Sequence, residues 1–219
     1  MRRHHLAFAL ALAFCLPLAA VAGDGDIDKV NGTARVEAGQ HAGDVSTVNG
    51  AVRIGDNAVV REASTVNGAI ELGTHVQADS LDTVNGSVEV GADSRIRSTI
   101  EAVNGSIRLG HNTDVGGRVS NVNGAIVLDT AHVAGGLGTV GGDIDVGAGS
   151  RVEGGILVDK PGGWFHWGDS RLPRIVIGPH AVVQGTLDFR REVVLEVSDS
   201  SQIGPVKGAT PVKFSGEQP

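Results

Sequence analysis

A tripeptide, Val-Asn-Gly, recurs six times along the chain at almost constant spacing. Successive copies lie 18 or 19 residues apart, and Val140-Gly141-Gly142 is a degenerate seventh copy. A repeat of this length predicts a solenoid, in which each repeat forms one coil that packs only against its neighbours. The six copies begin at Val30, Val48, Val66, Val84, Val103 and Val122.

Each repeat divides into three segments of six residues that start with an aliphatic side chain. Val48, Ile54 and Val60 start the segments of one repeat, and the frame continues to Val158. In Val52-Arg53-Ile54 two apolar residues flank a charged one, the pattern of a short strand with two side chains inward and one outward. About 18 residues with three strands and three bends predict an all-β fold, a three-sided parallel β-helix or solenoid. The period leaves the handedness of the coil undetermined.

The composition agrees with a narrow coil. Glycine accounts for 33 of 219 residues, which suits a chain that bends three times per coil. Aromatic residues make up 3% and tyrosine is absent, so we expect the interior to hold only aliphatic side chains. Two seven-residue segments, 96–102 and 115–121, account for the spacings of 19 and predict one extra residue in each of those coils.

The asparagine of each tripeptide falls at the same corner of every coil. An amide carries both a donor and an acceptor, so stacked amides can form a continuous hydrogen-bonded ladder. Asparagine also tolerates the left-handed conformation, and the following glycine permits a sharp bend. A row of surface amides that binds a ligand is the functional alternative, and we favour the structural ladder. Its members are Asn31, Asn49, Asn67, Asn85, Asn104 and Asn123.

The chain begins with the features of a secretory signal peptide. Arg2 and Arg3 precede an apolar stretch, and Ala20-Val21-Ala22 predicts cleavage after residue 22. Cleavage would leave 16 basic and 25 acidic side chains, and no membrane-spanning segment. This acidic balance disfavours nucleic acid as a partner. The mature chain would also lack cysteine, because Cys15 lies in the signal peptide. We expect a periplasmic, cell-surface or secreted protein.

The repeats of residues 23–158 are followed by a segment, 159–174, that does not fit the frame. It holds an aromatic cluster, Trp164, Phe165, His166 and Trp167, which is typical of a loop that recognises a glycan or a protein. The alternative is a loop that folds over the side of the solenoid and covers apolar surface. The periodicity resumes in residues 175–219, where Ile177, Leu195 and Lys213 are 18 apart, and predicts two or three further coils and a terminal cap.

The sequence offers weak signals for catalysis. His75 and His111, two repeats apart, could be zinc ligands but lack an identifiable third one, and no carboxylate stands beside any histidine in the sequence. Asp143 and Asp145 are similar to a calcium-binding nonapeptide, but its glycine pattern is incomplete. We therefore expect no catalytic residue, no metal and no cofactor.

The motif Thr-Val-Asn-Gly-x-Ile/Val, at residues 47–52, 65–70 and 83–88, resembles the repeats of a bacterial adhesin-type β-helix family. That resemblance covers residues 27–158 and implies a β-helix with an adhesin-like role. The segment 177–185 is similar to bactofilins, the polymer-forming β-helices of the bacterial cytoskeleton. Bactofilins are cytoplasmic, whereas this chain begins with a predicted signal peptide.

Three functional hypotheses follow. The first is an exported, non-enzymatic rod of the cell envelope that binds a glycan or protein through its flat faces or the aromatic loop. The second is a self-assembling structural polymer that associates through its coil ends, since uncapped strands pair readily. The third, which the sequence supports least, is a hydrolase or lyase that acts on envelope polysaccharide.

Overall fold

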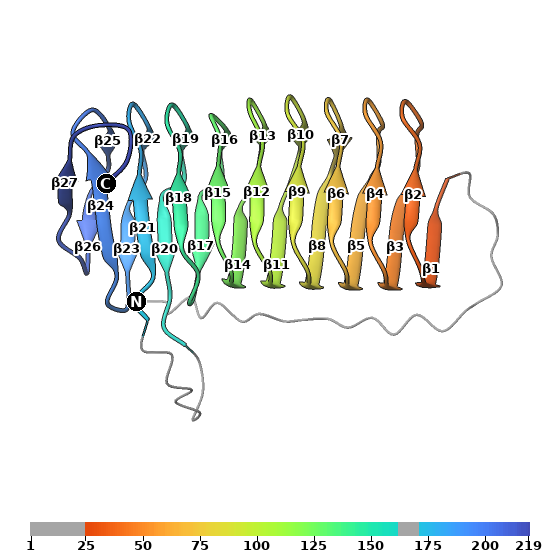
Figure 1. Ribbon diagram of the computed structural model, residues 1–219, viewed down its shortest axis with the longest axis horizontal. Helices are drawn as coiled ribbons and strands as arrows, with labels where there is room; N and C mark the ends of the chain where they lie inside the picture. The colour runs from red at the N-terminus through yellow and green to blue at the C-terminus, as the bar shows by residue number, and fades with distance from the viewer. Residues whose placement is uncertain (1–24, 162–170) are drawn as a thin grey trace, which may run out of the picture.

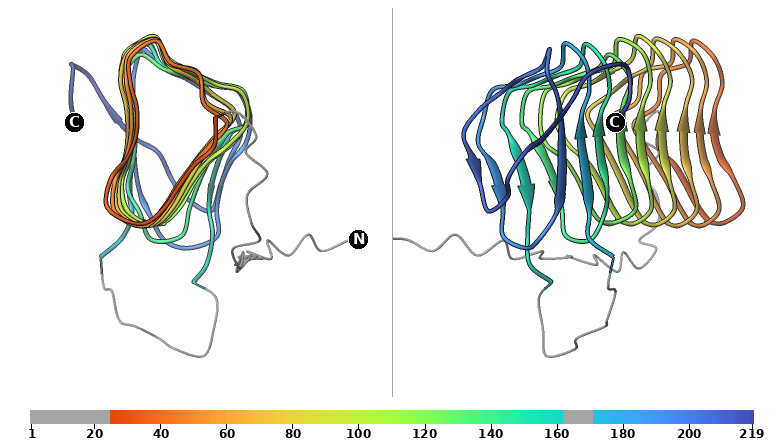
Figure 2. Two further views of the ribbon diagram at one scale, coloured as in Figure 1. Left: turned by 90° about the vertical axis from the view of Figure 1, so that its right-hand side faces the viewer. Right: turned by 60° about the vertical axis from the view of Figure 1, so that its left-hand side comes forward.

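A computed structural model describes residues 25–161 and 171–219. The chain winds as a three-sided parallel β-helix, and its coils stack into a rod (Figure 1). Viewed along the rod axis, the coils before the loop nearly superimpose on a triangular outline, and the C-terminal coils depart from it (Figure 2). The predicted all-β, three-sided solenoid is therefore confirmed, because all strand pairs are parallel and join equivalent residues of successive coils.

Three sheets form the sides of the rod. Sheet A contains β1 (Ile27–Asn31), β3 (Asp44–Asn49), β5 (Glu62–Asn67), β8 (Ser80–Asn85), β11 (Ile100–Asn104), β14 (Val119–Asn123), β17 (Leu137–Thr139), β20 (Ile156–Val158), β23 (Leu187–Phe189) and β26 (Val206–Lys207). Sheet B contains β2 (Ala34–Val36), β4 (Val52–Ile54), β6 (Ile70–Leu72), β9 (Val88–Val90), β12 (Ile107–Leu109), β15 (Ile126–Leu128), β18 (Ile144–Val146), β21 (Arg174–Ile177), β24 (Val194–Ser198) and β27 (Val212–Phe214). Sheet C contains β7 (Gln77–Ala78), β10 (Arg95–Ile96), β13 (Asp114–Val115), β16 (His132–Val133), β19 (Arg151–Val152), β22 (Val182–Val183) and β25 (Gln202–Ile203).

The interior is filled by Val, Ile, Leu and Ala, but the valines of the Val-Asn-Gly tripeptides do not belong to it. Val30 is 67% exposed and Val48 is 42% exposed. The aliphatic residue that starts a six-residue segment therefore does not line the interior in sheet A. The preceding threonine points inward instead, and Thr47, at 3% exposure, donates from Oγ1 to Gly32 O at 3.1 Å. Strand alternation then turns Val48 outward.

Buried threonine is acceptable here because each hydroxyl has an acceptor. Thr65 Oγ1 donates to Gly50 O at 3.0 Å, and Thr83 Oγ1 donates to Gly68 O at 3.2 Å. The hydroxyl thus satisfies the glycine carbonyl of the preceding coil at the corner between sheets A and B. The Thr-Val-Asn-Gly sequence therefore stabilises this corner from both sides of the backbone. The threonine forms its hydrogen bond on the inside of the coil, and the asparagine forms its bonds on the outside.

The asparagine side chains lie on the outside of this corner and form a ladder. Each Nδ2 donates to the Oδ1 of the asparagine in the preceding coil, over distances of 3.0 to 3.3 Å. The ladder runs through Asn31, Asn49, Asn67, Asn85, Asn104 and Asn123 without interruption.

In the four middle copies, Gly50, Gly68, Gly86 and Gly105, the glycine that follows is required by close packing and not by a positive φ. None of the six asparagines has a positive φ in the described chain, so this corner does not use the left-handed conformation that asparagine tolerates. A Cβ built on Gly68 would instead lie 1.8 Å from Gly50 O, and one on Gly86 would lie 1.8 Å from Gly68 O. Backbone stacks on backbone at this corner, and only glycine leaves room for it.

The extra residues predicted in 96–102 and 115–121 lie at the corner between sheets C and A. Ile96 pairs with Ala78, whereas Ile100 pairs with Leu81, so the later coil has one more residue across this corner than the earlier one. The additional residue therefore falls between Ile96 and Ile100. The wider corner recurs in the next coil, where Val115 pairs with Ile96 and Val119 with Ile100.

The coils after the loop follow a different register from the one predicted. Ile175 pairs with Leu195 and Ile177 with Val197, so the alignment of Ile177 with Leu195 is wrong. Two coils and one additional strand, β27, complete the rod, within the two or three coils expected. Phe189 is buried at 4% exposure, so the interior is not purely aliphatic at this end.

Two predicted segments lie outside the described residues. These are the signal peptide, residues 1–22, and the aromatic cluster Trp164–Trp167. The loop around that cluster leaves the rod after β20 and returns at β21, which places its ends between sheets A and B. Within the two described ranges there is no helix with the length and apolar character needed to cross a bilayer.

The ladder predicts a position-dependent loss of stability. Asn85→Ala removes two amide hydrogen bonds, to Asn67 and from Asn104, and should lower the free energy of unfolding by about 1–2 kcal/mol. Asn31→Ala is the matched control because it removes only the bond from Asn49 and should cost about half as much. Thermal and urea denaturation measure both, and an Asn85→Ala protein as stable as wild type would contradict a structural ladder.

Candidate functional site

An open groove runs along the outside of sheet C, parallel to the rod axis. Its volume is about 720 Å³, and it spans the coils of β7, β10, β13, β16 and β19. We call it the sheet C groove. Its lining residues are His75, Gln77, Asp93, Ser94, Arg95, Asn112, Thr113, Asp114, Thr130, Ala131, His132, Gly149 and Arg151.

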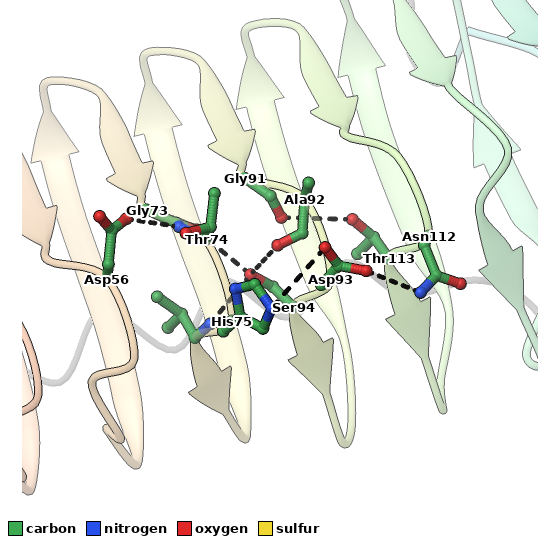
Figure 3. Close-up of polar contacts among 11 residues, drawn as sticks. Asp56, Gly73, Thr74, His75, Gly91, Ala92, Asp93, Ser94, Asn112 and Thr113 are labelled. Atoms are coloured by element: carbon green, nitrogen blue, oxygen red, sulfur yellow. Dashed lines mark hydrogen bonds and ion pairs between the residues drawn. The ribbon is translucent and has the colours of Figure 1, made fainter.

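One wall of the groove is the corner between sheets B and C. Each coil places one residue there in the left-handed conformation, with φ between 49° and 69° from His75 to Gly149. Asn112 Nδ2 donates to Asp93 Oδ1 at 2.8 Å, and His75 Nε2 lies 3.8 Å from Asp93 Oδ2. Figure 3 shows these three side chains in a row along the corner. The wall therefore combines an imidazole, a carboxylate and an amide from three successive coils.

A second polar row lies beneath this wall, inside the coil. Ser94, 1% exposed, accepts from Val76 N at 3.0 Å and donates from Oγ to Gly73 O at 3.2 Å. Thr113, also 1% exposed, donates to Gly110 O at 2.7 Å. Figure 3 shows both hydroxyls turned toward the backbone. These hydroxyls hold the corner in shape and are occupied by backbone groups, so they are poor candidates for nucleophiles.

The floor of the groove is a chain of alternating charges. Arg95 Nη2 lies 2.8 Å from Asp114 Oδ2, and His132 Nδ1 lies 2.7 Å from Asp114 Oδ1. His132 Nε2 is shielded from solvent and faces Glu153 Oε1 at 3.4 Å, and Arg151 Nε lies 3.3 Å from the same oxygen. Four coils contribute to this row, because strand register stacks their outward residues.

These contacts stabilise the ionised carboxylates. The hydrogen bond from His132, and after it the bond and charge of Arg95, lower the pKa of Asp114 below its ordinary value of 3.8. The hydrogen bond from Arg151, and after it the nearby His132 ring, lower the pKa of Glu153. The carboxylates in the floor of the groove therefore stay charged at neutral pH and hold the arginines and the imidazole in place.

No carboxylate lies beside His132 in the sequence, but the fold supplies one from the neighbouring coil. The partner Asp114 belongs to the preceding coil and becomes adjacent only because the coils stack. A search one period away from each histidine would have found this pair. His75 and His111, weighed as zinc ligands, form no such site, since among the described residues no three His, Cys, Asp or Glu side chains converge as metal ligands.

A second charged feature lies on the outside of sheet A. Asp82 faces Ser64 on one side and Glu101 on the other, and Glu62 stands nearby in β5. Burial, reinforced by the charges of Glu101 and Glu62, raises the pKa of Asp82 to about 6. This acidic row concentrates negative charge on a side of the rod away from the sheet C groove.

Asp114 is predicted to contribute to stability in a pH-dependent way. Its lowered pKa means that its contribution is present at neutral pH and is lost as the pH falls through the folded-state value. Asp114→Asn should lower the melting temperature by a few degrees at pH 7 and have little effect in strong acid. Melting temperatures measured from acid to neutral pH test this prediction. The control is Asp199→Asn, which changes an exposed aspartate near the C-terminal end of the rod. Equal effects at every pH would contradict the ion-pair account.

Asp82 is predicted to act in the opposite direction. Between its ordinary pKa of 3.8 and about 6 the folded chain holds a proton that the unfolded chain releases, so stability falls as the pH rises through this window. Asp82→Ser should therefore raise the melting temperature at neutral pH by a few degrees but not near pH 4. The matched control, Asp188→Ser, breaks the contact of Asp188 with Arg190 and should not stabilise. An Asp82→Ser protein no more stable than wild type at neutral pH would contradict the raised pKa.

Compared with known proteins, the chain matches no family model, no curated protein and no solved structure. The likeness of its repeats to adhesin-type β-helices and bactofilins stays a prediction. A functional assignment therefore depends on the chain's own residues.

Proposed function

We propose that the chain is an exported, non-enzymatic rod of the bacterial cell envelope that binds an extended polar glycan along the sheet C groove, an adhesin-like function. The observation that carries this proposal is the groove itself, which crosses five coils and presents polar side chains at each one. An extended polymer can contact all five coils at once, and many weak contacts then add up.

The chemistry of the groove favours a polar ligand with low charge density. Its charged groups already pair with one another, from Arg95 through Asp114 and His132 to Arg151. A strongly charged polymer would have to break these pairs. A guanidinium has five N–H donors, and the pair with Asp114 engages only Nε and Nη2 of Arg95. The remaining donors, with Gln77, can bind sugar hydroxyl groups.

The rigidity of the floor supports recognition by preformed contacts. Gln77, Arg95 and Asp114 occupy equivalent positions in consecutive paired strands. The backbone of such strands is fixed by the inter-coil hydrogen bonds, and the Arg95 and Asp114 side chains also hold each other, so this part of the floor needs little ordering when a ligand binds.

The absence of catalysis is also part of the proposal. Both ring nitrogens of His132 face carboxylates, at 2.7 and 3.4 Å, so neither is placed to take a proton from a ligand. The nearby hydroxyl of Thr113 is bonded to the backbone. A nucleophile with an adjacent free base, which covalent catalysis requires, is not formed by the described residues lining the groove.

Export and location are inferred from the sequence alone. The positive start, the apolar stretch and Ala20-Val21-Ala22 support cleavage after residue 22. A glycan of the envelope would then be accessible in the periplasm or at the cell surface.

Self-assembly into a polymer is a second candidate, and the sheet edges favour it. Among the described residues, sheets A and B end at one side in β1 and β2 and at the other in β26 and β27, each with one unpaired edge. Such edges can accept a strand from a second copy. Filaments seen by electron microscopy of the purified chain would support this candidate.

Binding is tested with envelope polysaccharide and a glycan array. The groove variant Arg95→Gln/Arg151→Gln should lose most binding, because it replaces two guanidinium groups of five N–H donors each by shorter amides of two. The matched control Arg35→Gln/Arg53→Gln makes the same charge change on sheet B and should bind as wild type. Far-ultraviolet circular dichroism checks the fold of each protein.

The same experiment decides between the groove and the aromatic loop. Loss of binding in Trp164→Ala/Trp167→Ala with full binding in the groove variant would move the site to the loop. Equal binding by the groove variant and wild type, or the release of new sugar ends from the polysaccharide, would overturn the proposal.

A further inference from the structure

The six Asn-Gly pairs of the chain are identical in sequence but differ in hydrogen bonding. In five of them the glycine N–H donates to the asparagine carbonyl of the following coil, over 2.8 to 3.1 Å. These five donors are Gly32, Gly50, Gly68, Gly86 and Gly105. The sixth, Gly124, has no acceptor for its N–H among the described residues.

The difference arises because the repeat degenerates in the following coil. Val140-Gly141-Gly142 takes the place of Val-Asn-Gly there, and Gly141 N donates back to Val122 O at 2.9 Å. Gly124 adopts a φ of +115°, whereas the four glycines before it in the row, from Gly50 to Gly105, are not in the positive region. The backbone of this corner thus departs from the pattern that protects the other pairs.

The side chain of Asn123 is likewise the last member of the ladder. Its Nδ2 donates to Asn104 Oδ1 at 3.1 Å. Residue 141 is a glycine and has no side-chain amide that could donate to the Oδ1 of Asn123. A Cβ on Gly141 would lie 3.0 Å from Asn123 Oδ1, which shows where the missing side chain would stand. The oxygen of the neighbouring buried Asn121 side chain has no hydrogen-bond partner in the described chain either. The amide after Asn123 is therefore less constrained than at the other five pairs, and the Asn123 side chain has one ladder bond where the four middle asparagines have two. Asn31 also has one ladder bond, but its glycine N–H donates to Asn49 O.

We propose that Asn123 is a modification site, at which the chain deamidates spontaneously while the other five Asn-Gly pairs are protected. The Gly124 nitrogen loses its proton to solvent base and attacks Cγ of Asn123. A bond from this nitrogen to Cγ forms, the Cγ–Nδ2 bond breaks, and Nδ2 leaves as ammonia after taking a proton from water. Water then opens the five-membered succinimide at either carbonyl, which gives aspartate or isoaspartate.

Hydrogen bonding protects the other pairs for two reasons. An N–H that donates to a carbonyl holds its proton more firmly than a free one, so the attacking anion forms less often. The same bond fixes the glycine against the next coil, and the attack requires this segment to rotate. The Gly124 N–H has no such hydrogen bond, so neither effect slows the reaction there. Glycine also has no Cβ that would hinder the attack of its nitrogen on Cγ of Asn123.

The modification would alter the ladder at its end. A carboxylate at position 123 cannot donate to Asn104 Oδ1, so the bond at 3.1 Å is lost. Isoaspartate would also lengthen the main chain by one carbon at the end of β14. Both changes fall at the boundary between the regular coils and the degenerate one.

The test compares the six sites within one protein. The purified full chain is incubated at body temperature in mildly alkaline buffer, digested in acid, and analysed by peptide mass spectrometry with isoaspartate detection. Asn123 should convert at least about tenfold faster than any other Asn-Gly site, because each of the others must first open an inter-coil hydrogen bond. In the chain unfolded by denaturant, the six sites should convert at similar rates.

Hydrogen exchange gives an independent readout of the same cause. The Gly124 amide should exchange faster than the amides of Gly68, Gly86 and Gly105. Asn123→Gln should abolish the acidic species that forms on incubation, and the matched variant Asn67→Gln should leave it unchanged. Uniform conversion of the six sites in the folded chain, or faster conversion at another site, would overturn the proposal.

Discussion

The parallel backbone ladder between consecutive coils is the interaction on which the whole molecule depends. Each strand donates to and accepts from the equivalent strand one coil away, and the chain contains no helix or disulfide among its described residues that could replace this. Because the pairing joins equivalent residues, a side chain chosen once per repeat becomes a row along the rod. The asparagine ladder, the buried threonines and the stacked glycines are three rows of this kind at a single corner.

The same rule explains how a site can form without any long loop. The residues in the floor of the sheet C groove are far apart in sequence, and each coil supplies one or two of them. Asp114 and His132 meet because they are one period apart, and Arg95 and Glu153 extend the row on either side. A charge at one coil is thus balanced by its neighbours above and below, which gives the groove its mixed character.

The repeat predicted the architecture, the number of sides and the position of the extra residues, since period and glycine placement directly determine coil geometry. It did not predict which face the Val-Asn-Gly valines occupy, because threonine seemed the polar residue of that strand and proved to be the buried one. The Asp114–His132 contact could have been predicted from the sequence, because the two residues lie one repeat of 18 residues apart. The pairing of Ile177 with Val197 was not, because the coil after the loop is longer than the regular period and only the folded backbone reveals by how much.

The extra residue between Ile96 and Ile100 has a consequence for how such a chain can change over evolutionary time. The coils that follow keep the wider corner. Val119 lies four residues after Val115 and Leu137 four residues after Val133, whereas Leu81 lies three residues after Ala78. The wider corner also persists from Val152 to Ile156 and from Val183 to Leu187, and the extra residue is lost in the last coil, between Ile203 and Val206. The corner between sheets B and C changes in a single coil, because the step from Leu128 to Val133 is five residues whereas the corresponding steps in the coils before and after it are six. One-residue insertions and deletions at the corners can therefore change the outline of the rod while the strand pairing of all three sheets is kept.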